Sequence, residues 1–125
     1  MWQQFNPNPD GLMVGDCVIR AVAGALDVTW EDAYMALCME GYRLHDLPNA
    51  DRVWGHYLQS HGFRREWLPG TCPVCYTVEQ FAADHPQGTY VLAIDGHAVC
   101  VRDGDWMDSW DSRSSVPLYA WHKED

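Results

Sequence analysis

The chain has 125 residues, of which 47% are apolar and seven are tryptophans, and its formal net charge is −10. This length fits one compact domain, residues 1–125, and the apolar content excludes a disordered acidic tail. The acidic balance argues against nucleic-acid binding, because no basic cluster is present to neutralise phosphates, and no apolar run approaches the roughly 18 residues of a membrane span.

The chain contains five cysteines, and its first residues lack both the basic and the apolar segment of a secretory signal. We therefore expect a cytoplasmic protein whose cysteines are reduced. Cys72 and Cys75 form a CxxC pair in a loop rich in Pro and Gly, and we expect two free loop thiols there. A structural zinc site and a redox pair are the alternatives. No second CxxC or HxxxH motif is present to complete four zinc ligands, and a redox motif would open a helix after a strand rather than lie in a loop. The sequence therefore predicts no metal and no cofactor.

Helical periodicity dominates the first half of the chain. A loop at residues 6–16 leads into an apolar segment, 17–26, with the pattern of a helix buried on all sides. Asp16 stands before this segment as its expected N-cap. Three further helices are predicted, one starting at Thr29, one following Asn49 and one at residues 77–84.

The second half of the chain has the pattern of β-strands. Four strands are predicted, at residues 89–94, 97–102, 106–110 and 116–121. Asp-Gly pairs at 95–96 and 103–104 separate the first three strands, and such pairs favour tight hairpins. Helices followed by an antiparallel sheet of about four strands define an α+β fold.

Cys17 is the cysteine best placed for chemistry. It opens the buried helix, where aligned peptide dipoles and free N–H groups favour a thiolate. Arg20 follows three residues later and adds positive charge. The backbone N–H of Cys17 is also a candidate oxyanion donor. The alternative is that Cys17 is a small buried apolar residue, as free cysteines usually are.

A second group of candidates lies on the hairpin around residues 103–104. A two-residue turn places His97 and Asp108 on the same face of the two strands, as diagonal neighbours within side-chain reach. A carboxylate in that position fixes the tautomer of the ring and stabilises the imidazolium. The alternative is a core histidine without a catalytic role. Cys100 falls on the opposite strand face, which leaves Cys17 as the nucleophile candidate.

Five short segments carry a family resemblance: 15–21 (GDCVIRA), 76–81 (YTVEQF), 85–90 (HPQGTY), 95–97 (DGH) and 103–111 (DGDWMDSWD). In their order they resemble the papain-like cysteine peptidases, and most closely the small bacterial and phage proteins similar to the C39 peptidases. The resemblance covers residues 6–121. It implies a papain-like fold, in which a buried nucleophile helix among N-terminal helices packs on a C-terminal antiparallel sheet.

The resemblance also implies a role for each candidate. Cys17 would be the nucleophile, His97 the base and later the acid, and Asp108 the residue that orients the imidazole. One feature departs from the family, because the six positions before Cys17 contain no Gln or Asn to donate to an oxyanion. Asn8 and Gln4 are the nearest amides and become the candidate donors.

The implied function is hydrolysis of a peptide, an isopeptide or a related amide through a thioester. Fold and triad do not choose among peptidase, amidase and acyl transferase. Trp106 and Trp110 flank the predicted site, as walls of a substrate cleft or as core residues. The expected partner is a peptide or protein substrate in the cytoplasm of a bacterium or of a phage host, without nucleic acid or membrane. The alternative is a phage-encoded binding module of papain-like fold whose triad is inactive. The sequence contains no pattern that identifies the substrate or the oligomeric state.

Overall fold

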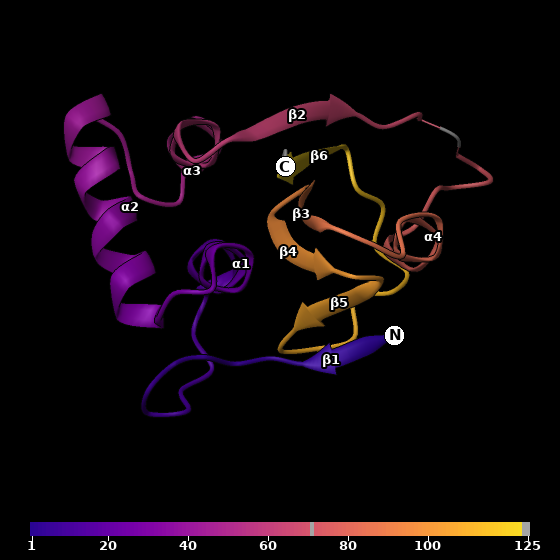
Figure 1. Ribbon diagram of the computed structural model, residues 1–125, viewed down its shortest axis with the longest axis horizontal. Coiled ribbons are helices and arrows are strands. Elements are labelled where there is room, and N and C mark those ends of the chain that lie inside the picture. The colour runs from indigo at the N-terminus through magenta and orange to yellow at the C-terminus, as the bar shows by residue number, and fades with distance from the viewer. Residues whose placement is uncertain (71, 124–125) are drawn as a thin grey trace.

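Figure 1 shows the computed structural model, which describes residues 1–70 and 72–123. Over these residues the chain forms four helices and one six-stranded sheet, so the fold is α+β as predicted. The helices are α1 (Cys17–Leu26), α2 (Trp30–Leu44), α3 (Asp51–Ser60) and α4 (Val78–Asp84). The strands are β1 (Trp2–Gln4), β2 (Phe63–Trp67), β3 (Thr89–Ile94), β4 (His97–Arg102), β5 (Asp105–Asp108) and β6 (Tyr119–Lys123).

The predicted helices are all present near their expected boundaries. α1 is buried along most of its length, as its apolar sequence predicts. α2 begins after Thr29, whose hydroxyl accepts a hydrogen bond from the Asp32 N–H. α4 begins after Thr77, which forms a capping box with Gln80. Within the described part of the chain, no helix is both long and apolar enough to cross a membrane.

The strand order in the sheet is β1-β5-β4-β3-β6-β2. Tight hairpins join β3 to β4 and β4 to β5 at the predicted Asp-Gly pairs. In the turn at 103–104 both residues have positive φ, 50° and 83°, as a two-residue hairpin requires. The register pairs Arg102 with Asp105, as predicted. His97 at the start of β4 and Asp108 at the end of β5 therefore lie at the same end of the sheet.

The prediction of four strands is wrong, because the described sheet has six. β1 is one edge strand and runs parallel to β5, while β2 is the other and pairs with β6. β1 has only three residues, and Phe63 is the one buried residue of β2. Edge strands that bury so little show no apolar alternation to recognise. The last two predicted strands are also shifted, since β5 ends at Asp108 and β6 begins at Tyr119.

Helices cover both faces of the sheet, with α1 to α3 on one side and α4 on the other (Figure 1). α1 packs directly on β4, and α2 lies outside it against α1 and α3. The apolar core therefore has two parts, one on each face. Along β4, Cys100 faces the α1 side while Val99 and Val101 face the α4 side. Burial raises the pKa of the Cys100 thiol to about 12, which excludes it as a nucleophile.

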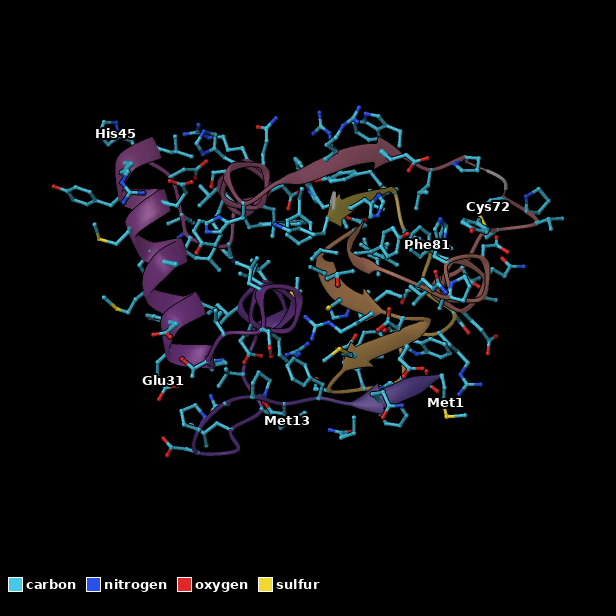
Figure 2. All side chains as sticks on the ribbon, viewed as in Figure 1. Met1, Met13, Glu31, His45, Cys72 and Phe81 are labelled. Carbon is cyan, nitrogen blue, oxygen red and sulfur yellow. A yellow bond between two sulfur atoms is a disulfide. The ribbon has the colours of Figure 1, made fainter. Side chains whose placement is uncertain are left out.

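Cys72 and Cys75 are joined by a disulfide, so the expectation of two free thiols is wrong. The two residues between them turn the chain until the Cα atoms lie 4.2 Å apart, close enough for the sulfurs to bond. Residues 1–70 and 72–123 contain no group of three or more side chains that could hold a metal ion. Figure 2 shows Cys72 beside α4, well away from α1, so this pair is remote from Cys17.

Candidate active site

Cys17 is the first residue of α1 and is partly buried. Asp16 occupies the N-cap position, but its side chain makes no capping hydrogen bond. Its carboxylate instead accepts from the Arg20 guanidinium at 2.5 Å and from the Trp30 indole N–H at 2.8 Å. Asp16 is thus the N-cap residue as predicted, but without a side-chain cap, because a charged donor is a stronger partner for a carboxylate than a backbone amide. The first backbone N–H groups of α1 therefore have no hydrogen bond from a capping side chain, and their partial positive charge lies beside the Cys17 thiol.

His97 begins β4, Asp108 ends β5, and their side chains are in direct contact. Nε2 of His97 lies 2.6 Å from Oδ2 of Asp108, which confirms the pairing predicted from the hairpin. The other ring nitrogen, Nδ1, is left for Cys17, whose thiol is hydrogen-bonded to the imidazole. Three side chains that are far apart in sequence therefore form one continuous chain of hydrogen bonds.

Asp108 is 1% exposed and accepts hydrogen bonds at both oxygens. Oδ1 accepts from Nη2 of Arg20 at 2.9 Å and from the backbone N–H of Ser109 at 2.8 Å. Oδ2 accepts from the Ser112 hydroxyl at 2.8 Å. Burial raises the pKa of the Asp108 carboxyl, but hydrogen bonds from His97 and Ser112 and the adjacent positive charges outweigh it and hold the pKa below its usual range. The carboxylate is therefore ionised and fixed in orientation.

Cys17 and His97 shift each other's protonation. Burial raises the pKa of the Cys17 thiol, but hydrogen bonds with His97 and the Ala98 backbone, together with nearby positive charge, bring it below its ordinary value. Burial lowers the pKa of His97, but hydrogen bonds with Asp108 and Cys17 outweigh it and raise the pKa to about 9. Both directions favour a thiolate beside an imidazolium.

Arg20 has a larger part in the site than its sequence position suggests. The sequence predicts only that it adds positive charge near Cys17. In the structure its buried guanidinium bridges Asp16 and Asp108, and so ties the loop before α1 to the end of β5. The sequence does contain one indication of this role, an arginine inside an otherwise apolar helix. A charge buried at such a position requires carboxylate partners.

A small pocket of about 160 Å³ opens beside Cys17 and His97. Its walls come from the start of α1, the start of α3 and the turn between β3 and β4. One side-chain amide is among its described lining residues, that of Asn49 just before α3. The sequence marks Asn49 only as the start of a helix. Its place at the pocket comes from the packing of α3, which no local pattern reveals.

The two amides proposed from sequence as oxyanion donors lie elsewhere. The side-chain oxygen of Asn8 accepts from the backbone N–H groups of Asp10 and Leu12, and so holds its own loop. Gln4 is exposed on β1. Neither residue lines the pocket. The pocket beside Cys17 therefore has the amide of Asn49 in its lining, and not the amides nearest to Cys17 in sequence.

Of the two tryptophans expected to flank the site, only one lies beside it. The Trp110 ring is 48% exposed, and its centroid lies 5.0 Å from that of the His97 ring. Trp106 is 3% exposed and belongs to the α4-side core, with its indole N–H bonded to Asp111. Trp106 is therefore a core residue and not a cleft residue, since its side chain leaves the sheet on the α4 face.

No protein-family model, curated protein or solved structure matches this chain. The site itself consists of a thiol hydrogen-bonded to an imidazole, a fixed carboxylate behind the imidazole and a pocket beside the thiol. This arrangement can supply a thiolate nucleophile and then give a proton to a leaving group.

Proposed function

We propose that the protein is a cysteine-dependent hydrolase of papain-like fold that acts on a peptide, an isopeptide or a related amide. The observation that carries the proposal is the 2.6 Å hydrogen bond between His97 and Asp108. The Cys17 thiol, at the start of a buried helix, is hydrogen-bonded to the same imidazole. The chain order Cys, His, Asp and the packing of the nucleophile helix on the sheet support the papain-like assignment.

The proposed reaction begins with attack by the Cys17 thiolate. A C–S bond forms at the substrate carbonyl carbon, and the carbonyl electrons move onto oxygen. The backbone N–H of Cys17 and the side-chain amide of Asn49 are the donors available to this oxyanion. The His97 imidazolium gives its proton to the departing amine, the C–N bond breaks, and a thioester remains.

Hydrolysis of the thioester completes the cycle. Neutral His97 takes a proton from a water molecule as the water oxygen attacks the thioester carbon. The intermediate collapses to release the carboxylic acid and restore the thiolate of Cys17 beside an imidazolium. Asp108 stays ionised throughout and holds the ring with Nδ1 toward the sulfur. An amine in place of water would make the same site an acyl transferase.

The size of the pocket bears on the kind of substrate. Its volume of about 160 Å³ is below the roughly 300–1,000 Å³ typical of pockets that enclose a whole small molecule. Only the atoms around the scissile bond fit inside it, and the rest of the substrate must lie outside. A flexible segment of a peptide or protein meets this condition, so we propose such a segment as the substrate.

The rate of cysteine alkylation as a function of pH tests the proposal before any substrate is known. Iodoacetamide labelling from about pH 5 to about pH 9 is mapped to each cysteine by mass spectrometry, in the wild type and in His97→Ala. Below about pH 7 we expect Cys17 to react at least about tenfold faster than Cys38, because its thiolate persists there. His97→Ala should abolish this advantage.

His61→Ala is the matched control, because His61 is exposed and does not line the pocket. It should leave the labelling of Cys17 unchanged. If Cys17 instead titrates as an ordinary thiol near pH ~8.5 in the wild type, the catalytic proposal is wrong. The chain would then be described better as a papain-like binding module whose triad does not react.

A further inference from the structure

A second concavity, here called the α3–β2 groove, adjoins the Cys17 pocket. It is open, has a volume of about 700 Å³ and lies between α3 on one side and β2 and β6 on the other. Asp51, in the first turn of α3, lines both concavities, so the two meet there. From Asp51 the groove follows α3 to Gln59, about 12 Å at the helical rise per residue. An extended peptide covers that length with about four residues.

Arg65 lies on an aromatic platform in this groove. Its guanidinium carbon is 5.0 Å from the ring centroid of Trp67, 5.4 Å from that of Tyr119 and 5.8 Å from that of Trp121. These side chains share one face of the β2–β6 pair, because Arg65 is paired with Trp121 and Trp67 with Tyr119. Trp67 is 65% exposed, so the platform is open to solvent. The guanidinium of Arg65 stacks on these rings with its planar face, so its N–H groups along the edge can still bind a carboxylate.

The charges of the groove favour an anionic ligand. The ion pairs among residues 1–70 and 72–123 do not include Arg65. Arg52 and Arg64 line the same groove, but Arg52 is paired with Asp46 at 2.8 Å, and Asp51 adds a carboxylate to the lining. That carboxylate already accepts a hydrogen bond from the Trp54 indole at 3.1 Å. Arg65 is thus a cation that a carboxylate in this groove can reach, although the net charge of the chain is −10.

Trp121 forms the inner part of this platform. Its side chain is 6% exposed and lines the groove. Its indole N–H is buried and has no hydrogen-bond partner among the described residues. Because it is buried, this N–H does not face the open groove, and the ring instead contributes its face to the platform beside Arg65. The indole is held in place by α3, because a Cβ on Gly55 would come within 2.8 Å of its Cζ2 atom.

We propose that the α3–β2 groove binds a carboxylate of the substrate, with the Arg65 guanidinium as its partner and the aromatic platform holding that guanidinium in place. The inference rests on the proposed hydrolase function and specifies its substrate. That substrate is a peptide with a carboxylate in the stretch of about four residues that follows the groove beyond Asp51. The carboxylate belongs either to an acidic side chain or to a C-terminus, since both present the same acceptor oxygens.

Binding of three short peptides tests this inference without requiring catalysis. The first is an acetylated and amidated pentapeptide with a central glutamate, the second has glutamine in its place, and the third is the glutamine peptide with a free C-terminal carboxylate. They are titrated into the full-length chain carrying Cys17→Ala, and NMR follows the indole N–H signals, with Trp121→Phe to assign the Trp121 signal. A carboxylate peptide should bind at least about tenfold more tightly than the neutral one and shift the Trp121 signal.

Substitutions at Arg65 locate the effect. Arg65→Gln should remove the preference, while Arg65→Lys should keep part of it, because lysine retains the charge without the planar fork. Arg113→Gln makes the same charge change at an exposed position outside the groove, and should leave binding unchanged.

Each outcome separates this inference from the hydrolase proposal. Preference for the glutamate peptide alone identifies an acidic side chain, and preference for the free-acid peptide alone identifies a C-terminus; both support the inference. Equal binding of all three peptides, or binding of none, overturns it, whatever the alkylation of Cys17 shows. An unreactive Cys17 in the wild type overturns the hydrolase proposal and with it the role of the groove in catalysis, even where a carboxylate binds.

Discussion

One buried arginine determines how the imidazole is oriented. Arg20 binds Asp16 and Asp108, and Asp108 in turn binds His97. Loss of any member leaves a buried charge without its partner, which costs more than the pair itself contributes. The guanidinium is therefore held between two carboxylates, and Asp108 is held facing the ring.

Asp108→Asn tests that arrangement at a single atom. We expect it to slow alkylation of Cys17 at about pH 6 by at least about tenfold, because a neutral amide no longer stabilises the imidazolium that accompanies the thiolate. Ser112→Ala is the matched control, since it removes one hydrogen bond to the same carboxylate but keeps its charge. It should slow the reaction by less than about threefold. Equal losses in the two folded variants would contradict the role given to Asp108.

The amide of Asn49 gives a separate prediction. Asn49→Ala should lower kcat on an amide substrate by about 10²–10³, the usual cost of losing one oxyanion donor. The alkylation profile of Cys17 should not change, because the oxyanion forms only during acyl transfer. Asn8→Ala is the comparison, since Asn8 holds its own loop and does not line the pocket. If the Asn8 variant loses more turnover than the Asn49 variant, the original expectation for Asn8 is restored.

At the scale of elements, α3 approaches β6 closely because Gly55 has no side chain. A Cβ at this position would lie 2.8 Å from Cζ2 of Trp121. Gly55→Ala should therefore destabilise the fold by about 1–3 kcal/mol through overpacking, although alanine favours a helix by about 1 kcal/mol. Urea unfolding measures the change. Gly70→Ala, where a Cβ would meet nothing within 4 Å, should alter stability by less than about 0.5 kcal/mol.

The helices and hairpins that are predicted correctly are those whose sequence signals lie within a few neighbouring residues. A capping threonine, an apolar helical face or an Asp-Gly turn each lies within a few residues, and α2, α4 and the two hairpins follow from them. β1 and β2 depend instead on partners far along the chain, β5 and β6. Nothing within Trp2–Gln4 or Phe63–Trp67 encodes that pairing, so neither strand is predicted.

The same distinction applies to the candidate site. His97 and Asp108 are predicted together because a two-residue turn fixes their register, and Cys17 because it opens a helix. Asn49 reaches the pocket only through the packing of α3 beside α1, and Asp108, the second carboxylate partner of Arg20, lies 88 residues away along the chain. Such contacts arise from tertiary structure, and reading along the chain does not reveal them.

At the scale of the whole molecule, the raised pKa of His97 links folding to pH. A ring whose pKa is about 9 when folded and about 6.5 when unfolded binds its proton more tightly in the folded chain. The resulting stabilisation is fully present below about pH 6.5 and is lost as the pH rises through about 9. The lowered pKa of the Cys17 thiol acts in the opposite direction over part of this range.

Urea unfolding of Cys17→Ala isolates the contribution of His97, because Asp108 still raises the pKa of the ring there. Its free energy of unfolding should fall as the pH increases above about 6.5. Adding His97→Gln should flatten that fall, since glutamine does not titrate. A slope that persists in the double variant would assign the pH dependence to other groups.

In the proposed hydrolase, the separation of Cys17, His97 and Asp108 along the chain determines when the thiol becomes reactive during folding. Arg20 and Asp108 are 88 residues apart, and Trp2, whose indole N–H binds the Asp108 carbonyl, is 106 residues from it. Contacts of such long range form late in folding, after the costs of loop closure are met. During synthesis Cys17 emerges early but remains an ordinary thiol until the hairpin of His97 and Asp108 docks on α1. The proposed hydrolase would therefore gain its nucleophile only in the completed fold, and not while the chain is still on the ribosome.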